Sequence, residues 1–230
     1  MQAPHERIVV SVGGSLIVPD DIDTDFLSRF RDLIRGEIAL GHSFAIIAGG
    51  GATARSYQEA AHKVVATLPQ EDLDWIGIHS TRLNAQLLRN IFAEEAYPHI
   101  VKNPTADLSA EEPMLIAGGW KPGWSTDYCA VQIAKNLGAR RLVNLSNTDY
   151  VYTADPKKDP NAKKIEKISW GDFRNIIPDH WDPGLSSPFD PVAAKEAEAL
   201  SLEVAVINGA HLDRFSDYLA AKPFIGTTIS

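Results

Sequence analysis

The chain has 230 residues, of which 44% are hydrophobic and 23% charged, and this is the composition of an ordinary globular protein. A chain of this length buries about 70% of its unfolded surface, so we expect a hydrophobic core that needs no metal or disulfide. The net charge of −8, from 22 Lys and Arg against 30 Asp and Glu, disfavours binding to nucleic acid polymers. The single cysteine, Cys129, excludes an intrachain disulfide and a thiolate zinc cluster. The sequence shows no signal-peptide pattern and no apolar run of membrane-spanning length, so we expect a cytoplasmic protein.

Strands and helices are predicted to alternate along the chain. Short apolar runs predict strands at 7–12, 43–48, 98–101, 114–117, 141–145 and 203–207, a hairpin around 150–152, and an edge strand at 225–229. Helical spacing predicts helices around 26–34 and over 52–66, 72–95, 127–137, 190–200 and 212–219. Continuously apolar strands between helices indicate a mainly parallel sheet covered on both faces. The segment 178–188 is the most loop-like, and we interpret it as a surface connection rather than a lid.

Two glycine clusters each end a predicted strand and precede a helix, Gly13-Gly14-Ser15 and Gly49-Gly50-Gly51. Glycines at such a turn let backbone N–H groups approach an anion, and the helix N-terminus adds positive potential. Because the carboxyl ends of parallel strands meet at one edge of a sheet, the two turns predict one crevice that binds phosphate groups. The alternative is that the glycines only make tight strand-to-helix turns.

The sequence limits which phosphate ligand this crevice binds. No Gly-Lys dipeptide occurs, which excludes a P-loop. The segment 49–54 fits the dinucleotide pattern G-x-G-x-x-A, but Glu71, Asp72 and Asp74 open another helix instead of ending the next strand, which weakens that hypothesis. Arg55, one turn after Gly51, is either a bidentate phosphate clamp or a surface arginine.

A polar stripe lies within the predicted helix over 72–95. Asp74, Gly77, Thr81 and Asn84 are separated by three, four and three residues, which places them on one face. We interpret this stripe as a sugar-binding face, since a carboxylate accepts hydrogen bonds from two ribose hydroxyls. The alternative is a solvated helix face.

Two further loops carry candidate binding groups. The loop over 118–127 combines tryptophans, Lys121 and hydroxyl groups, and Thr126 or Ser125 is the predicted N-cap of the next helix. It is either an acceptor pocket or a plain capped loop. In the segment 146–156, Tyr152 is placed to pack against a base and Asp155 to hold a ribose or amino group.

These segments, in this order, resemble the amino acid kinase superfamily. The matching pieces are VGGSLIVP, GGGATAR, DWIGIHSTRLN, PGWSTD, SNTDYVYTADPKKDP and FDPVAAK, and they cover nearly the whole chain. The aspartate stripe and the P-G-x-[ST]-T-D motif resemble the archaeal uridylate kinase branch of that superfamily. The resemblance implies an α/β fold, a three-layer αβα sandwich with a mainly parallel central sheet, and a hexameric assembly. It implies a single domain over 1–230, with an acceptor-nucleotide half over about 1–135 and an ATP half over about 136–230.

The resemblance also implies which residues bind the two nucleotides. ATP phosphates would face Ser11, Val12, Gly13, Gly14, Ser15, Gly51 and Arg55, and the adenosine part would contact Ser146, Asn147, Tyr152 and Asp155. UMP would be held by Gly50, Asp74, Gly77 and Thr81 and by the loop of Trp120, Lys121, Pro122, Gly123, Trp124, Ser125 and Thr126. Asp190 would lie near the transferring phosphoryl group and its Mg²⁺, with Arg55 and Lys195 as catalytic cations.

The activity implied by the resemblance is phosphorylation of UMP to UDP by ATP, with Mg²⁺ as cofactor. The acceptor is a phosphate oxygen that is already ionised, so positioning and charge neutralisation are sufficient and no general base is required. One alternative is a related kinase acting on a carboxylate or carbamate, which the aspartate stripe disfavours. Another is a nucleotide-binding storage or sensor protein on the same fold, and a Rossmann-type oxidoreductase is the third.

Two positions depart from the superfamily pattern. Many members have a lysine in the first strand where this chain has Ser11, and Lys121, Lys195 or a lysine within 157–164 is a candidate for the missing cation. Tyr150 stands where a glycine is common. The archaeal branch is similar in tolerating the loss of the lysine, so Ser11 does not predict an inactive protein.

Overall fold

A seven-stranded sheet forms the centre of the computed structural model, which describes residues 7–178 and 187–230. The strand order is β3-β2-β1-β4-β8-β9-β7. The strands are β1 (Arg7–Val12), β2 (Ser43–Ala48), β3 (Met114–Ala117), β4 (Arg141–Ser146), β7 (Lys167–Ile168), β8 (Glu203–Asn208) and β9 (Thr227–Ile229). The first five in the order are parallel, whereas β9 runs antiparallel to β8. A separate antiparallel hairpin pairs β5 (Val151–Tyr152) with β6 (Lys164–Ile165).

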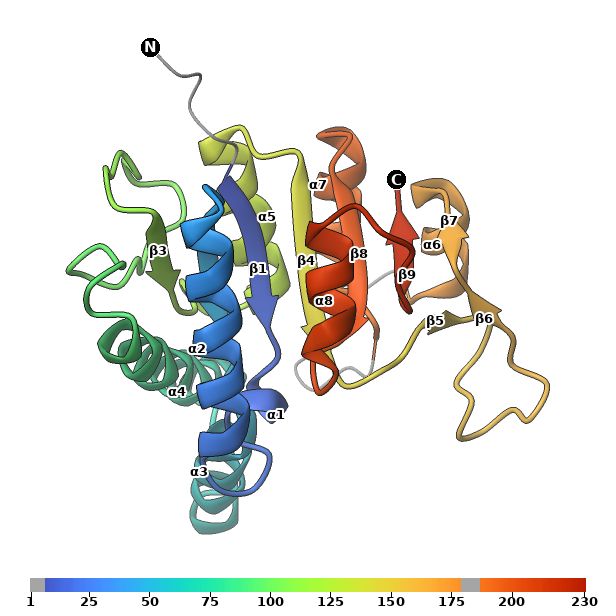
Figure 1. Ribbon diagram of the computed structural model, residues 1–230. Coiled ribbons are helices and arrows are strands. Elements are labelled where there is room, and N and C mark those ends of the chain that lie inside the picture. The colour runs from blue at the N-terminus through green and yellow to red at the C-terminus, as the bar shows by residue number, and fades with distance from the viewer. Residues whose placement is uncertain (1–6, 179–186) are drawn as a thin grey trace.

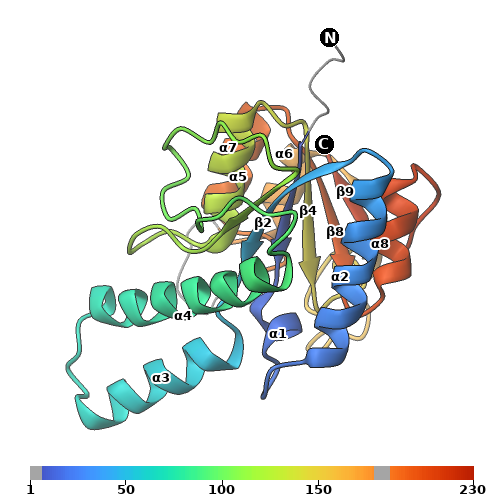
Figure 2. The same ribbon diagram turned by 60° about the vertical axis from the view of Figure 1, so that its left-hand side comes forward.

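Helices cover both faces of the sheet, which gives three layers (Figure 1). One face carries α2 (Thr24–Ala39) and α8 (Leu212–Leu219), and the opposite face carries α5 (Thr126–Leu137), α6 (Trp170–Ile176) and α7 (Pro191–Ala199). The short α1 (Gly14–Ile17) follows β1 directly. Figure 2 shows α3 (Gly51–Val64) and α4 (Gln70–Ile91) projecting as a pair beyond the carboxyl ends of the parallel strands. The predicted three-layer αβα sandwich is confirmed.

The alternation of side chains along β1 divides the core into two layers. Ile8 and Val10 point to one side and join Phe30 of α2, whereas Val9 points to the other side and joins Phe173 of α6 and Ala130 of α5. All of these side chains are fully buried. Since both faces of the strands are buried, the strands have the near-continuous apolar runs from which they were predicted.

Several predicted elements differ from the structure. The predicted strand at 98–101 contributes only an isolated bridge, from Val101 to Ala117, because Pro98 has no N–H to donate to a ladder. The predicted edge strand at 225–229 is β9, which lies inside the sheet, and β7 forms the edge. A two-residue strand such as β7 carries too few residues to show a period of two.

Three further observations concern the helices and loops. Helix α6 was not predicted, although Ser169 is its N-cap and accepts a hydrogen bond from the Asp172 backbone N–H. Most of the loop-like segment at 178–188 lies outside the described residues, so that prediction stays untested. Among the helices of the described ranges, none is both long enough and apolar enough for a bilayer crossing.

The two glycine turns after β1 and β2 touch through their backbones. A Cβ atom on Gly14 would lie 2.0 Å from the Gly51 nitrogen, and one on Gly49 would lie 2.3 Å from the Gly14 nitrogen. Gly51 also has φ +64°, the left-handed conformation that side chains disfavour. Only glycines fit this contact, which brings the start of α1 and the start of α3 together.

Replacing Gly14 tests how strictly this contact is required. Gly14→Ala is expected to lower the free energy of unfolding by about 1–3 kcal/mol or more, because a methyl group would overlap the neighbouring backbone. Urea denaturation measures the change. Gly36→Ala is the matched control, since Gly36 lies in α2 with open space around it and alanine there gains up to about 1 kcal/mol of helix propensity. Equal stability of the two variants would contradict the proposed contact.

Candidate functional site

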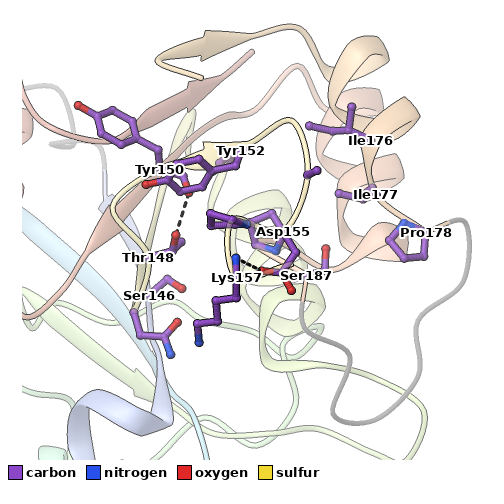
Figure 3. A pocket seen from close by; sticks show the side chains of 15 residues that line it. Ser146, Thr148, Tyr150, Tyr152, Asp155, Lys157, Ile176, Ile177, Pro178 and Ser187 are labelled. Atoms are coloured by element: carbon purple, nitrogen blue, oxygen red, sulfur yellow. Dashed lines mark hydrogen bonds between the residues drawn. The ribbon is translucent and has the colours of Figure 1, made fainter. Parts of the chain in front are cut away.

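Two cavities open at the carboxyl ends of the parallel strands. The first, here the β5 cavity, has a volume of about 280 Å³ and is lined by the loop 146–152, the segment 154–157 and residues near the end of α6 (Figure 3). The second, here the α4 cavity, has a volume of about 730 Å³ and is lined by α3, α4 and the loop 119–126. Asn147 lines both cavities. Two ligands bound in them would therefore meet beside Asn147.

Aromatic and acidic side chains border the β5 cavity. Tyr152 and Tyr150 both line it, with their rings edge to face at 6.3 Å between centroids. Asp155 also lines the cavity, and one of its carboxylate oxygens accepts a hydrogen bond from the Lys157 backbone N–H at 2.9 Å. An aromatic ring with a nearby carboxylate fits a flat base joined to a sugar. Tyr150, at the position where a glycine is common, leaves the cavity open.

The loop that follows β4 is fixed by contacts that the sequence did not predict. The Asp149 carboxylate accepts hydrogen bonds from Asn208 at the end of β8 and from Arg214 of α8. The Arg214 and Asn208 hydrogen bonds hold the pKa of Asp149 below its usual value. The Gly209 backbone N–H also donates to the Ser146 carbonyl at 2.9 Å. These groups are far apart in the sequence, and no local pattern relates them.

Helix α4 supplies one wall of the α4 cavity and holds the loop opposite. Asp74, Gly77 and Thr81 line the cavity. The Asp74 carboxylate accepts a hydrogen bond from the Gly123 N–H at 2.9 Å, and the Thr81 hydroxyl accepts one from the Gly119 N–H at 2.7 Å. The predicted polar stripe thus faces a ligand-sized space and a backbone loop.

Two residues of the same helix have roles that the sequence did not show. Arg82, which was not predicted, donates to the carbonyl oxygens of Gly119 at 3.1 Å and Trp120 at 2.8 Å. Asn84 was predicted to belong to the sugar-binding face, but it is buried beneath the second glycine turn. Its amide donates to the Gly49 carbonyl at 2.8 Å and the Gly50 carbonyl at 3.1 Å. Asn84 therefore supports the turn, and the stripe at the cavity ends at Thr81.

The loop over 119–126 presents stacked aromatic rings and a lysine. Trp124 lies 4.0 Å from Tyr128 between ring centroids, and the Lys121 ammonium lies 4.2 Å from the centre of the Trp120 ring. Lys121, Gly123, Trp124, Ser125 and Thr126 line the α4 cavity, whereas Trp120 and Pro122 do not belong to its lining. Ser125 is the N-cap of α5, which confirms one of the two predicted caps.

Two acidic side chains, the buried Asp190 and the partly buried Asp127, lie beside Ser11 of β1. The Ser11 hydroxyl donates to one Asp127 carboxylate oxygen at 3.1 Å, and the Asp190 N–H donates to the other at 3.3 Å. Asp190 is the N-cap of α7 and accepts from the N–H groups of Val192 and Ala193. Burial, and next the charge of Asp190, raise the pKa of Asp127 to about 7. The position expected to carry a lysine in many relatives thus holds a hydroxyl group bonded to a carboxyl group.

The remaining residues that were predicted to bind the nucleotides lie in the first glycine turn, along the α4 cavity and in a third cavity. Val12 is fully buried, so only its backbone can face a ligand, and Gly13, Gly14 and Ser15 form the turn from β1 into α1. Gly50, Gly51 and Arg55 line the α4 cavity, and the Arg55 guanidinium donates to the Pro19 carbonyl at 3.0 Å. Lys195 lines a third cavity of about 120 Å³ together with Arg174 and is absent from the lining of the other two.

A match to known proteins gives the class to which this fold and site belong. The amino acid kinase family matches residues 6–208, which is most of the chain. The chain belongs to the amino acid kinase family.

The chain is also similar to individual members of that family, and those described here are uridylate kinases. The chain is 36% identical over 226 residues to the uridylate kinase of Pyrococcus abyssi, covering 97% of this chain and 99% of the relative. It is 36% identical to the uridylate kinase of Thermococcus kodakarensis, covering 94% and 96% of the two chains. The crystal structure of uridylate kinase from Archaeoglobus fulgidus superposes with a TM-score of 0.82 at 28% identity, covering 97% of this chain and all of that one.

The raised pKa of Asp127 predicts a dependence of stability on pH. The folded-state pKa of about 7 lies above the ordinary value of 3.8, so the native state binds the proton more tightly than the unfolded state does. The resulting stability is present below pH 4 and is lost as the pH rises through 7, by on the order of 1 kcal/mol for each unit of the shift. Asp127→Asn removes this loss, so its stability relative to wild type should rise from pH 4 to pH 8.

Urea denaturation of the protein without nucleotide or Mg²⁺ measures this difference. Asp107→Asn is the matched control, because a hydrogen bond from the Ser109 hydroxyl lowers the pKa of the exposed Asp107 below its ordinary value of 3.8. The stability of this variant relative to wild type therefore changes only below about pH 4 and should stay at a constant offset from pH 4 to pH 8. An Asp127→Asn variant whose stability stays at a constant offset from wild type over this range would contradict the raised pKa.

Proposed function

We propose that this protein transfers the γ-phosphoryl group of ATP to UMP and so forms UDP. The observation that carries the proposal is the pair of cavities that adjoin at Asn147, at the carboxyl ends of parallel strands where α/β proteins bind nucleotides. The uridylate kinase relatives, matched over nearly their full length, support the same activity.

ATP is assigned to the β5 cavity. Tyr152 packs against the adenine, and Asp155 with Ser146 and Asn147 accepts or donates hydrogen bonds to the base and ribose. The phosphate chain runs toward the first glycine turn, where the backbone of 11–15 and Gly51 supplies N–H dipoles. Support for this direction comes from the Gly13 N–H, which donates to the Leu145 carbonyl just before Ser146.

UMP is assigned to the α4 cavity. The Asp74 carboxylate accepts hydrogen bonds from the ribose hydroxyls beside Gly77 and Thr81, and the loop that includes Lys121, Trp124 and Thr126 encloses the base. The UMP phosphate then lies near Gly50 and Arg55. This placement leaves Trp120 and Pro122 as supports of the loop rather than direct contacts.

The reaction requires positioning and charge neutralisation. The acceptor oxygen of UMP is already ionised, so in-line alignment of the two phosphates beside Asn147 replaces a general base. Mg²⁺ bound to the ATP phosphates reduces the charge on the transferred group. In the described ranges no three His, Cys, Asp or Glu side chains form a metal-binding group, which fits an ion held by substrate phosphates plus one or two carboxylates. We assign this role to Asp190, with the neighbouring Asp127 as a second candidate.

We also propose how the chain is divided into halves and how it assembles. Residues 1–230 form a single domain whose acceptor half, about 1–135, contains most of the α4 cavity and whose ATP half, about 136–230, contains the β5 cavity. We also propose, from the resemblance to uridylate kinases, that the protein forms a homohexamer in the cytoplasm. A catalytic role for Lys195 has less support, since Lys195 lines neither of the two proposed nucleotide cavities.

A panel of acceptors separates this activity from its alternatives. With ATP and Mg²⁺, we expect turnover with UMP that exceeds turnover with CMP, AMP, acetylglutamate and carbamate. A preference for acetylglutamate or carbamate would instead indicate a kinase for carboxylates or carbamates. ATP binding without turnover of any acceptor would contradict the kinase proposal and support a storage or sensor protein.

Asp74→Asn tests the acceptor site. Loss of the negative charge is expected to raise the KM for UMP roughly 10-fold, the worth of one or two charge-assisted hydrogen bonds, while the KM for ATP changes little. Asp72→Asn is the matched control, because Asp72 is exposed in the first turn of the same helix and does not line the cavity. Equal increases for both substrates would show that Asp74 does not hold UMP.

A further inference from the structure

The end of β1 carries negative charge where the proposed phosphate chain needs positive charge. Ser11 is 3% exposed and Asp190 5% exposed, and both contact the partly buried Asp127. No lysine or arginine of the described residues forms an ion pair with these carboxylates. A polyphosphate bound beside them therefore requires a cation from another element.

The other candidate cations contact other groups or line other cavities. Arg55 lies in the α4 cavity and donates to the Pro19 carbonyl, and Lys121 lies over the Trp120 ring. Lys195 lines the third cavity, which shares Ile177 and Pro178 with the β5 cavity but does not include Ser146 beside the first glycine turn. None of these three side chains lines the β5 cavity, where the proposed ATP binds.

Lys157 is placed differently, because its side chain enters the β5 cavity. Figure 3 shows the chain of Lys157 extending toward Ser146, from the turn in which its backbone N–H donates to Asp155 at 2.9 Å. Ser146 ends β4, and its Cα atom would lie 3.9 Å from a Cβ atom on Gly13. Lys157 thus extends from the base-binding end of the cavity toward the first glycine turn.

The neighbouring lysines of the same segment do not share this placement. Lys158 lies 3.7 Å from the Asp155 carboxylate, and Lys164 pairs with Glu166 at 2.8 Å and lies 4.9 Å from the Tyr150 ring centre. Lys163 is exposed and absent from the cavity lining. Within the part of the chain that the structure describes, Lys157 forms no ion pair, so its ammonium group is available to a ligand.

We propose that Lys157 binds the phosphate chain of the nucleotide in the β5 cavity and supplies the positive charge that Ser11 does not. The proposal rests on the proposed function only in taking ATP as the occupant of this cavity. Lys157 then acts on the polyphosphate, and its contribution to binding depends on the number of phosphates and not on the base.

Binding of ATP and of adenosine to three variants tests this role. We expect Lys157→Met to weaken ATP binding roughly 10-fold or more, the worth of a hydrogen bond to a charged group, and to leave adenosine binding unchanged. Lys157→Arg should restore most of the ATP affinity. Lys163→Met, which removes the same charge from the same hairpin, should bind both ligands as the wild type does. Isothermal titration calorimetry with Mg²⁺ present measures all four proteins, and thermal unfolding checks that each is folded.

The possible outcomes separate this inference from the proposed function. A selective loss of ATP affinity in Lys157→Met supports the role of Lys157 even if the wild type fails to phosphorylate UMP. Equal ATP affinities of Lys157→Met and wild type would overturn the role, whether or not UMP is phosphorylated. Equal losses for ATP and adenosine would also overturn it, because they would show that Lys157 only shapes the loop. A wild type that binds no ATP would overturn both.

Discussion

The direct contact between the two glycine turns is the constraint on which the rest of the structure depends. Gly14 and Gly49 approach each other through backbone atoms, at distances that any side chain would block. This contact brings the starts of α1 and α3 to one point at the edge of the sheet. The amide of Asn84 bonds to the carbonyls of Gly49 and Gly50 from beneath, so the turn is held by α4 as well. The proposed arrangement of the two ligands depends on this convergence, because Gly50 and Gly51 line the α4 cavity and Ser146 of the β5 cavity lies beside Gly13.

The negative net charge of the chain limits how nucleotides can bind at this edge of the sheet. A protein with net charge −8 that binds two nucleotides must concentrate its positive potential locally. Backbone N–H groups at the helix starts provide part of it. The negative charge of Asp127 and Asp190 acts in the opposite direction, and the proposed site therefore relies on a cation such as Lys157 and on Mg²⁺ carried by ATP. The site that we propose combines N–H dipoles, one or two side-chain cations and an ion that arrives with the substrate.

Much of the fold could be predicted because burial leaves a local signal. The strands at 7–12, 43–48 and 114–117 are buried on both faces, and their apolar runs give their limits directly. The edge strand β7 and the helix α6 are short, and too few of their residues are buried in a regular pattern to be recognised. The last strand was predicted, but not its place within the sheet, since strand order depends on packing between distant segments.

The candidate site could be predicted only in part, for a similar reason. Glycine turns and the Asp74 stripe appear in the sequence because the residue types and spacings are local. Arg82 and Arg214 were missed because their partners, the carbonyls of Gly119 and Trp120 and the carboxylate of Asp149, lie 37 or more residues away. Asn84 matched the helical spacing of the stripe, yet its position faces the glycine turn. Spacing alone does not tell which part of a helix face meets solvent and which meets backbone.

The central claim is that both nucleotides are bound at the same time, on either side of Asn147, so that the phosphoryl group passes directly between them. Initial rates measured with ATP and UMP varied against each other test this claim most directly. The double-reciprocal lines are expected to intersect, as a ternary complex of the protein with both nucleotides requires. Parallel lines, which indicate that the phosphoryl group is first transferred to the protein, would contradict it.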